Sequence, residues 1–113
     1  MKTKLTLTII LCFGIFINSS FSQKIFKTEY DYQADIKVFI VDYDYQADLC
    51  VYFVDYGYQA DKHGLWYMVE YGYQADKKVY FVDYGYQADL KISIVDYSYQ
   101  AGWKNNSKQH LLH

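Results

Sequence analysis

The sequence predicts a mostly β fold: a compact single domain of six strand repeats, each about 13 residues long, in two pseudo-equivalent halves. Three observations lead to this prediction. One tyrosine-rich phrase recurs six times, strand-forming Val, Ile, Tyr and Phe alternate with other residues at a two-residue period, and no stretch shows the apolar stripe of a helix. Aromatic residues make up 21% of the chain and proline is absent, which excludes a disordered protein.

The repeated phrase is Tyr-x-Tyr-Gln-Ala-Asp, and its sixth copy ends in Gly102 instead of Asp. The leading tyrosines are spaced by 13, 13, 15, 13 and 13 residues, so three repeats, a joint and three more repeats form two matching halves. The joint falls in residues 61–64, where Gly64 suits the fourth position of a type I turn. The structural repeat positions are the two tyrosines and the glutamine of each copy: Tyr30, Tyr32, Gln33, Tyr43, Tyr45, Gln46, Tyr56, Tyr58, Gln59, Tyr71, Tyr73, Gln74, Tyr84, Tyr86, Gln87, Tyr97, Tyr99 and Gln100.

Each repeat alternates over most of its length, as a long strand does. In the second copy one side carries Phe39, Val41, Tyr43, Tyr45 and Ala47, and this apolar face predicts that the tyrosines pack in the core. Burying a tyrosine ring removes ~150 Å² from water and contributes roughly 4 kcal/mol at ~25 cal/mol per Å². The residue between the paired tyrosines is Gly, Asp or Ser in every copy, which predicts a bend or bulge in each strand.

Residues 1–22 have the features of a secretory signal peptide. Lys2 and Lys4 precede an apolar run over residues 5–17, which at ~1.5 Å per residue makes about 20 Å of helix, too short for a hydrocarbon core of ~30 Å. Small residues then precede a predicted cut between Ser22 and Gln23. We therefore expect a periplasmic or secreted protein without a stable membrane span. The alternative interpretation of the run is a short hydrophobic anchor or a core strand.

The cut would leave a six-repeat β domain over residues 23–102 and a C-terminal tail over residues 103–113. Cys12 would leave with the signal, so that Cys50 could form no intramolecular disulfide. We expect Cys50, in an apolar strand, to be a buried small hydrophobe rather than a reactive thiol. The sequence of the tail predicts a short helix capped by Asn106 or Ser107. The tail either docks on the repeats or is loose. Docking is favoured because Trp103, Leu111 and Leu112 would otherwise be exposed.

The tandem Val-Asp-Tyr-x-Tyr-Gln-Ala-Asp phrases and the Ala-Gly-Trp-Lys ending at residues 101–104 resemble a small bacterial family, the septoil (seven-crossing torus) knot domains. The resemblance covers roughly residues 24–113. It implies a compact β-rich domain that is deeply knotted and has no established biochemical activity. A two-strand torus knot can be drawn as one curve making two intertwined laps, and the three-plus-three spacing is compatible with two equal laps.

Acidic side chains recur in two rows. One row precedes the leading tyrosines: Glu29, Asp42, Asp55, Glu70, Asp83 and Asp96. The other row follows the alanines: Asp35, Asp48, Asp61, Asp76 and Asp89. The rows permit a calcium-binding carboxylate ladder or, alternatively, a solvated or turn-capping row paired with lysines such as Lys37, Lys62, Lys77 and Lys91. We favour the second, because no copy has the dense alternating oxygen donors of a calcium loop.

The remaining polar residues give no catalytic pattern. We expect His63 to be exposed in the central turn, and His110 and His113 lack the further ligands that a metal site needs. Gln33 and its counterparts are expected to satisfy backbone or phenol groups at strand crossings. No Ser–His–Asp, Cys–His or phosphate-loop pattern occurs, so we expect no enzyme, no catalytic residue and no cofactor.

The favoured function is therefore that of an exported structural or binding domain, whose partner is a glycan or another exported protein. Residues 23–113 carry 9 lysines and 13 acids, a net charge of 9 − 13 = −4, which is the wrong sign for binding nucleic acid. A first alternative is a carbohydrate- or cell-wall-binding module that exposes part of its repeated tyrosines. A second is a functional amyloid or adhesive β-repeat protein built on the uncharged segments 51–54 and 79–82.

Overall fold

The structure, a computed structural model, describes residues 23–112, so that the predicted signal peptide and His113 lie outside the described residues. Along this stretch short strands alternate with short 3₁₀ elements. The strands are β1 (Lys24–Lys27), β2 (Ile36–Ile40), β3 (Leu49–Phe53), β4 (Leu65–Met68), β5 (Lys77–Phe81), β6 (Leu90–Ile94) and β7 (Gly102–Trp103). The 3₁₀ elements are η1 (Asp31–Gln33), η2 (Asp44–Gln46), η3 (Gly57–Gln59), η4 (Gly72–Gln74), η5 (Gly85–Gln87), η6 (Ser98–Gln100) and η7 (Asn106–Leu112).

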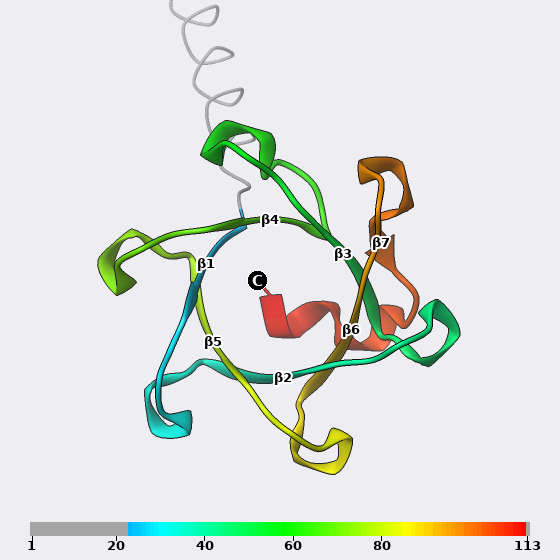
Figure 1. Ribbon diagram of the computed structural model, residues 1–113, viewed down its shortest axis with the longest axis horizontal. Coiled ribbons are helices and arrows are strands. Elements are labelled where there is room, and N and C mark those ends of the chain that lie inside the picture. The colour runs from blue at the N-terminus through cyan, green and yellow to red at the C-terminus, as the bar shows by residue number, and fades with distance from the viewer. Residues whose placement is uncertain (1–22, 113) are drawn as a thin grey trace, which may run out of the picture.

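Strands β1 to β6 form a closed ring in which all neighbours are parallel (Figure 1). The order around the ring is β4-β1-β5-β2-β6-β3, and the ring closes because β3 also pairs with β4. Strand β7 pairs with the first half of β3 in the antiparallel sense, while β4 pairs with its second half. The mostly β fold in one compact domain is confirmed.

The ring is built by two interleaved laps of the chain. The first lap supplies β1, β2 and β3, and the second supplies β4, β5 and β6. Each strand has strands of the other lap on both sides, since β1 lies between β4 and β5, β2 between β5 and β6, and β3 between β6 and β4. The two equivalent halves predicted from the repeat spacing are therefore these two laps.

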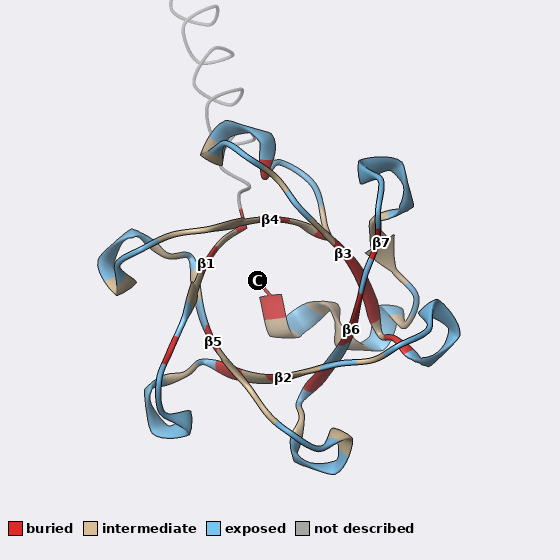
Figure 2. Ribbon diagram, in the orientation of Figure 1, coloured by how far each residue is buried: buried red, intermediate tan, exposed pale blue. Residues whose placement is uncertain are grey.

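Buried residues lie along the strands of the ring (Figure 2), and aliphatic side chains and one tryptophan form the core. The positions alternate as a strand requires: in β2, Ile36 and Val38 are buried while the residues that follow them are not. The core residues on the six strands are Ile25, Ile36, Val38, Leu49, Val51, Trp66, Val79, Leu90 and Ile92. Val, Ile and Leu predominate because their branched side chains fit the narrow interior of a small barrel.

The prediction that the tyrosines pack in the core is wrong. The first tyrosine of each pair is 55–59% exposed and the second is 78–86% exposed. The strands are shorter than the period suggested: β2 ends at Ile40, and the chain leaves the ring before it reaches Tyr43. Six short strands already fill the interior with aliphatic side chains, and the twelve phenol rings are carried outside it.

The predicted bend in each repeat is a 3₁₀ turn. In the first copy the Gln33 N–H donates to the Tyr30 carbonyl and the Ala34 N–H donates to the Asp31 carbonyl, both at 3.2 Å. The glutamine side chain completes the turn, because Oε1 of Gln33 accepts a hydrogen bond from the Tyr30 N–H at 3.3 Å. Gln59, Gln74, Gln87 and Gln100 accept the equivalent bond. The glutamines do satisfy backbone groups, but within their own turn rather than at strand crossings.

The joint between the laps is a turn over residues 62–65. The Leu65 N–H donates to the Lys62 carbonyl at 3.1 Å, so Gly64 is the third residue of the turn and not the fourth as predicted. Its φ of +89° suits the third position of a type II turn. A Cβ at this position would lie 2.5 Å from the Cys50 carbonyl oxygen, so both conformation and space require glycine.

The tail docks on the barrel, as predicted. Leu112 is buried in the core cluster, and Trp103 and Leu111 pack against it. The first turn of η7 is capped by Asn105 rather than Asn106 or Ser107, because Oδ1 of Asn105 accepts hydrogen bonds from the Ser107 N–H and hydroxyl at 3.2 and 2.7 Å. His63 is half-buried rather than exposed, and its Nδ1 accepts a hydrogen bond from the Trp103 indole at 2.9 Å.

Four aspartates of the second acidic row hold the two laps together. The Asp89 N–H donates to the Lys37 carbonyl at 2.8 Å, and the Asp89 carboxylate accepts from the Lys37 N–H at 2.9 Å. Each aspartate therefore holds one residue of the neighbouring lap at two points. The four pairs are Asp35 with Lys78, Asp48 with Lys91, Asp76 with Lys24, and Asp89 with Lys37. These carboxylates do not cap turns as predicted, because they bind the backbone of the neighbouring lap. Of the lysines predicted as their partners, Lys37 and Lys91 take part in these bonds, through the backbone N–H.

Removing one of these carboxylates should weaken the fold. We expect Asp89→Ala to lower the free energy of unfolding by about 1 kcal/mol, because a charge-assisted hydrogen bond between the laps is lost at a solvent-exposed site. Asp83→Ala in the same repeat is the control, and as an exposed acid of the first row it should change stability by less than about 0.5 kcal/mol. Urea unfolding followed by tryptophan fluorescence measures both; equal effects would contradict a structural role for Asp89.

Candidate binding surface

Six equivalent arms radiate from the barrel, one after each strand of the ring (Figure 1). Each arm consists of a 3₁₀ turn and its two flanking segments, and its tip carries the paired tyrosines. The first tyrosine has extended backbone, with φ between −128° and −133°, and the second lies inside the turn. The two side chains, which are two residues apart, lie on the same side of the arm.

The two tyrosine rings of every arm are stacked on one another. Their centroids are 5.6–5.8 Å apart and their planes differ by 10–16°. Offset stacking at this separation is a favourable arrangement of aromatic rings. One face of each ring is used by its partner, and the second tyrosine is 78–86% exposed. Each arm therefore presents a rigid aromatic platform to solvent.

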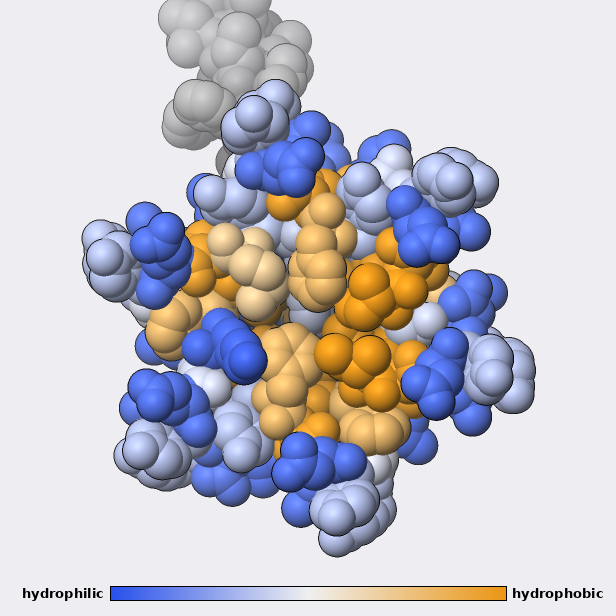
Figure 3. All heavy atoms as spheres, viewed as in Figure 1, coloured by the Kyte–Doolittle hydropathy of each residue, from blue (hydrophilic) through white to orange (hydrophobic). Residues whose placement is uncertain are grey.

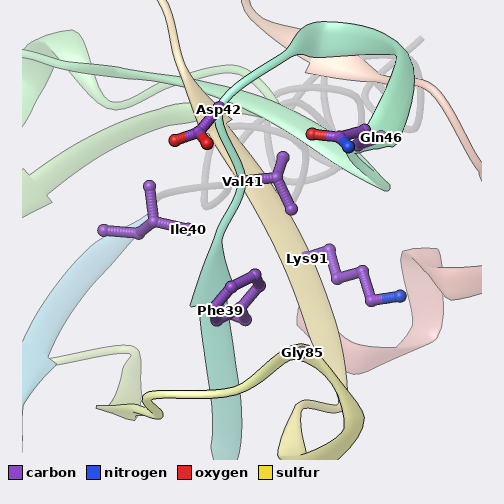
Figure 4. Close-up of a pocket in the computed structure, with 7 residues that line it drawn as sticks. All are labelled: Phe39, Ile40, Val41, Asp42, Gln46, Gly85 and Lys91. Carbon is purple, nitrogen blue, oxygen red and sulfur yellow. The ribbon is translucent and has the colours of Figure 1, made fainter.

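A groove runs beside the arms and has the same lining in successive repeats. In one copy the groove, of about 490 Å³, is lined by Phe39, Ile40, Val41, Asp42, Gln46, Gly85 and Lys91 (Figure 4). A second copy of about 440 Å³ lies 13 residues earlier, with Phe26, Thr28, Glu29, Gln33, Gly72 and Lys78 at the corresponding places. A third, of about 300 Å³, includes Tyr67, Glu70 and Gln74.

The first two grooves are each shared between the two laps. Phe39 and Asp42 come from the first lap, while Gly85 and Lys91 come from the second. A Cβ on Gly85 would lie 3.5 Å from the Phe39 ring, so the backbone of one arm lies close to the aromatic side chain of the neighbouring strand. The result is an aromatic floor with a carboxylate, an amide and an ammonium group around it.

The aromatic floor was missed in the sequence, although a signal for it was present. An aromatic residue occurs four positions before the leading tyrosine in five of the six copies, at Phe26, Phe39, Tyr52, Tyr67 and Tyr80. The sixth copy has Ser93, whose hydroxyl donates to the Asp44 carboxylate at 2.9 Å. All five aromatic residues are half-buried. An alignment of the six repeats on their leading tyrosines would have revealed this aromatic position four residues earlier.

The acids of the first row lie beside the arms and are all exposed: Glu29, Asp42, Asp55, Glu70, Asp83 and Asp96. In the second row, Asp35, Asp48, Asp76 and Asp89 bond to backbone amides instead of converging on a common point. Across residues 23–112, no group of three or more His, Cys, Asp or Glu side chains is gathered as a metal site would require. In the tail, Nδ1 of His110 lies 3.1 Å from the Ser107 carbonyl and donates to it.

Cys50 is buried in β3 with 1% of its surface exposed, as predicted. Burial raises the pKa of its thiol, and the nearby Asp44 carboxylate raises the pKa further. The thiolate that reacts with electrophiles is therefore disfavoured. Cys50 therefore has a packing role, since its side chain is buried. Its backbone carbonyl oxygen lies close to Gly64 in the joint.

We expect Cys50 in the folded protein to resist modification by a small electrophile such as iodoacetamide near neutral pH, because the thiol is both protonated and covered. The same reaction in strong denaturant, where the thiol is accessible, is the control. Intact mass before and after treatment measures the difference. Rapid labelling of the folded chain would contradict the burial of Cys50.

Comparison with protein families gives one match. The model of the 7(1) septoil knot domain matches residues 22–104, well over half of the chain. The chain belongs to the septoil knot domain family. No curated protein and no solved structure matches.

The family match covers all the structural parts that build the candidate surface. Residues 22–104 include both laps of the septoil knot domain, the joint, all six arms and β7, and they end before η7. The resemblance noted from the tandem phrases is thereby confirmed. Within residues 23–112, no helix is long and apolar enough to cross a bilayer.

Proposed function

We propose that this septoil knot domain is an exported, multivalent carbohydrate-binding module without catalytic activity of its own. One observation carries the proposal: twelve tyrosines stand outside the core in six stacked pairs, with the outer ring of each pair 78–86% exposed. Exposing aromatic rings to water is energetically unfavourable. A contiguous or repeated set of exposed rings therefore marks a binding surface.

The chemistry of each arm suits a sugar. The apolar C–H face of a pyranose stacks on an aromatic ring, and tyrosine adds a phenol hydroxyl that donates to and accepts from sugar hydroxyls. The groove beside the arm supplies an aromatic floor at Phe39, a carboxylate at Asp42 and an ammonium at Lys91. Hydrogen-bonding groups placed around an apolar surface are the usual composition of a small-molecule site.

Repetition favours a polymer over a single small ligand. Six arms of the same structure surround one rigid barrel, so a chain of repeating sugars can contact several arms at once. Each further contact is then intramolecular, and the overall affinity exceeds that of one arm without any new type of contact. Weak binding at a single arm is therefore compatible with tight retention on a cell-wall or extracellular glycan.

The same repetition argues against catalysis. A catalytic site brings unlike groups together at one place, such as a nucleophile, a base and an oxyanion stabiliser. Here each arm repeats the same tyrosines, glutamine and acid. The described thiol, Cys50, is buried with a raised pKa, which is the opposite of what a nucleophile needs.

The amyloid alternative has less support. Segments 51–54 and 79–82 were its candidates, and most of their residues lie in β3 and β5, each of which has neighbours on both sides in the closed ring. Assembly through these segments requires the ring to open, because closed barrels remove the free edges that template strand addition.

A glycan-binding experiment with matched variants tests the function. The six outer tyrosines (Tyr32, Tyr45, Tyr58, Tyr73, Tyr86 and Tyr99) are changed together to Ala, and in a second variant to Phe. Both variants should fold, because the outer rings are mostly exposed. Retention on insoluble peptidoglycan and on a glycan array should fall about tenfold or more in the Ala variant, equivalent to about 1.4 kcal/mol, while the Phe variant keeps most of it.

A variant in which only Tyr32, Tyr45 and Tyr58 become Ala separates multivalent from single-site binding. It should lose considerably more than half of the retention, because avidity falls steeply when contacts are removed. Glycan retention that survives removal of all six outer rings would refute the proposal. So would the failure of the unmodified protein to bind any glycan on the array.

A separate experiment tests whether the protein is exported. The full chain expressed in a Gram-negative host should appear in the periplasm or medium, beginning at Gln23. The control is a variant in which Lys2 and Lys4 are changed to Glu. This variant should be exported less, because its signal peptide lacks the positively charged start. N-terminal sequencing of the periplasmic fraction decides the cut, and an uncleaved cytoplasmic chain would refute the proposed location.

A further inference from the structure

The two ends of the barrel differ. The tail covers the amino ends of the strands: the Lys104 and Asn105 N–H groups donate to the Asp48 carbonyl at 2.8 and 2.9 Å, next to the start of β3. The Lys108 ammonium donates to the Asp89 carbonyl at 2.9 Å, next to the start of β6. Leu112, at the end of η7, belongs to the core cluster. No such segment among the described residues covers the carboxyl ends.

The carboxyl ends form a ring that is largely apolar. Because the six strands are parallel, their last residues lie at the same end of the barrel. These residues are Lys27, Ile40, Phe53, Met68, Phe81 and Ile94, and together they define the carboxyl mouth. Ile40, Phe53 and Ile94 are 46%, 38% and 39% exposed. Figure 3 shows apolar side chains gathered over the near end of the barrel.

Acidic side chains surround this mouth. Each acid of the first row follows a strand end by two residues, and all six are exposed. In Figure 4 Ile40 and Asp42 extend from the same side of the chain, with Phe39 and Val41 on the other. The mouth itself contains a single cation, Lys27, whose ammonium lies 5.9 Å from the centre of the Phe81 ring. An apolar centre is therefore ringed by carboxylates, with one positive charge among them.

The charges select the class of partner. A second copy docked by the same mouth would bring six carboxylates against six, which is repulsive. A second copy docked by its tail end would cover apolar side chains with the polar surface of η7, where Ser107 and His110 are exposed and Leu112 is already buried. The acidic rim would likewise repel an anionic membrane surface. A cationic segment with apolar side chains satisfies both parts of the mouth.

We propose that the carboxyl mouth binds a segment of another protein in which leucine-like side chains alternate with lysine or arginine. The apolar side chains contact Ile40, Phe53 and Ile94, and the cations pair with the surrounding carboxylates. This site adjoins the grooves beside the tyrosine arms, since Ile40 and Asp42 line both. It does not include the tyrosine pairs, which are carried by arms that extend sideways from the barrel (Figure 1).

A synthetic peptide of alternating leucine and lysine serves as the probe, with the unmodified full chain as the receptor. Titration calorimetry should detect binding that weakens as salt increases, because screening reduces the charge contribution. Ile40→Thr combined with Ile94→Thr keeps β-branched strand formers and should weaken binding about tenfold, equivalent to about 1.4 kcal/mol. Two altered peptides are controls: serine in place of leucine and glutamate in place of lysine should each abolish binding.

The Ala variant of the six outer tyrosines separates this site from the glycan site. It should bind the peptide like the unmodified protein, so the failure of one proposal leaves the other standing. Thermal unfolding confirms that each variant is folded before titration. Equal peptide affinity of the double Thr variant would overturn the proposal, as would binding of the serine peptide. Sedimentation that shows stable self-association through the mouth, abolished by the double Thr change, would overturn it in favour of a second copy.

Discussion

The whole structure depends on hydrogen bonding between two laps of the same chain. No strand of the ring pairs with another strand of its own lap, so neither lap has a sheet by itself. Parallel pairing requires a crossover between successive strands, and here the tyrosine arms are those crossovers. Four of these crossovers, those containing η1, η2, η4 and η5, each pass over one strand of the other lap, so the next strand lies two positions further around the ring. The arm that contains η3 instead joins the adjacent strands β3 and β4.

The two-point aspartate contacts explain why the repeat ends in Ala-Asp. The alanine closes the 3₁₀ turn through its N–H, and the aspartate then fixes the register of the next strand against the other lap. A slip by one residue would turn every core side chain outwards, so this register must be firmly specified. The sixth copy has Gly102 instead of aspartate, at φ +145°, and there the chain turns into the antiparallel β7.

The repeat revealed the architecture more reliably than the placement of single side chains. Its spacing predicted two halves because the number and length of the repeats are direct properties of the sequence. Alternation through Val41, Tyr43 and Tyr45 was misleading, because it continues beyond Ile40, where β2 ends, into the arm that carries both tyrosines. The local sequence around each residue did predict the burial of Cys50 and the docking of Leu112. It could not find the groove between Phe39 and Lys91, because that site forms only when the second lap returns beside the first.

The joint at Gly64 has a consequence for how such a chain reaches its native state. Most neighbouring residues across the ring are 43 or 52 positions apart, as in the contacts of Asp35 with Lys78 and of Asp76 with Lys24. Tyr52 and Leu65, on either side of the joint, are only 13 positions apart and still belong to adjacent parallel strands. Closing a short loop costs less entropy than closing a long one. We therefore expect folding to nucleate at β3 and β4, with the two chain ends threading last, a sequence of events that φ-value measurements on both strands can test.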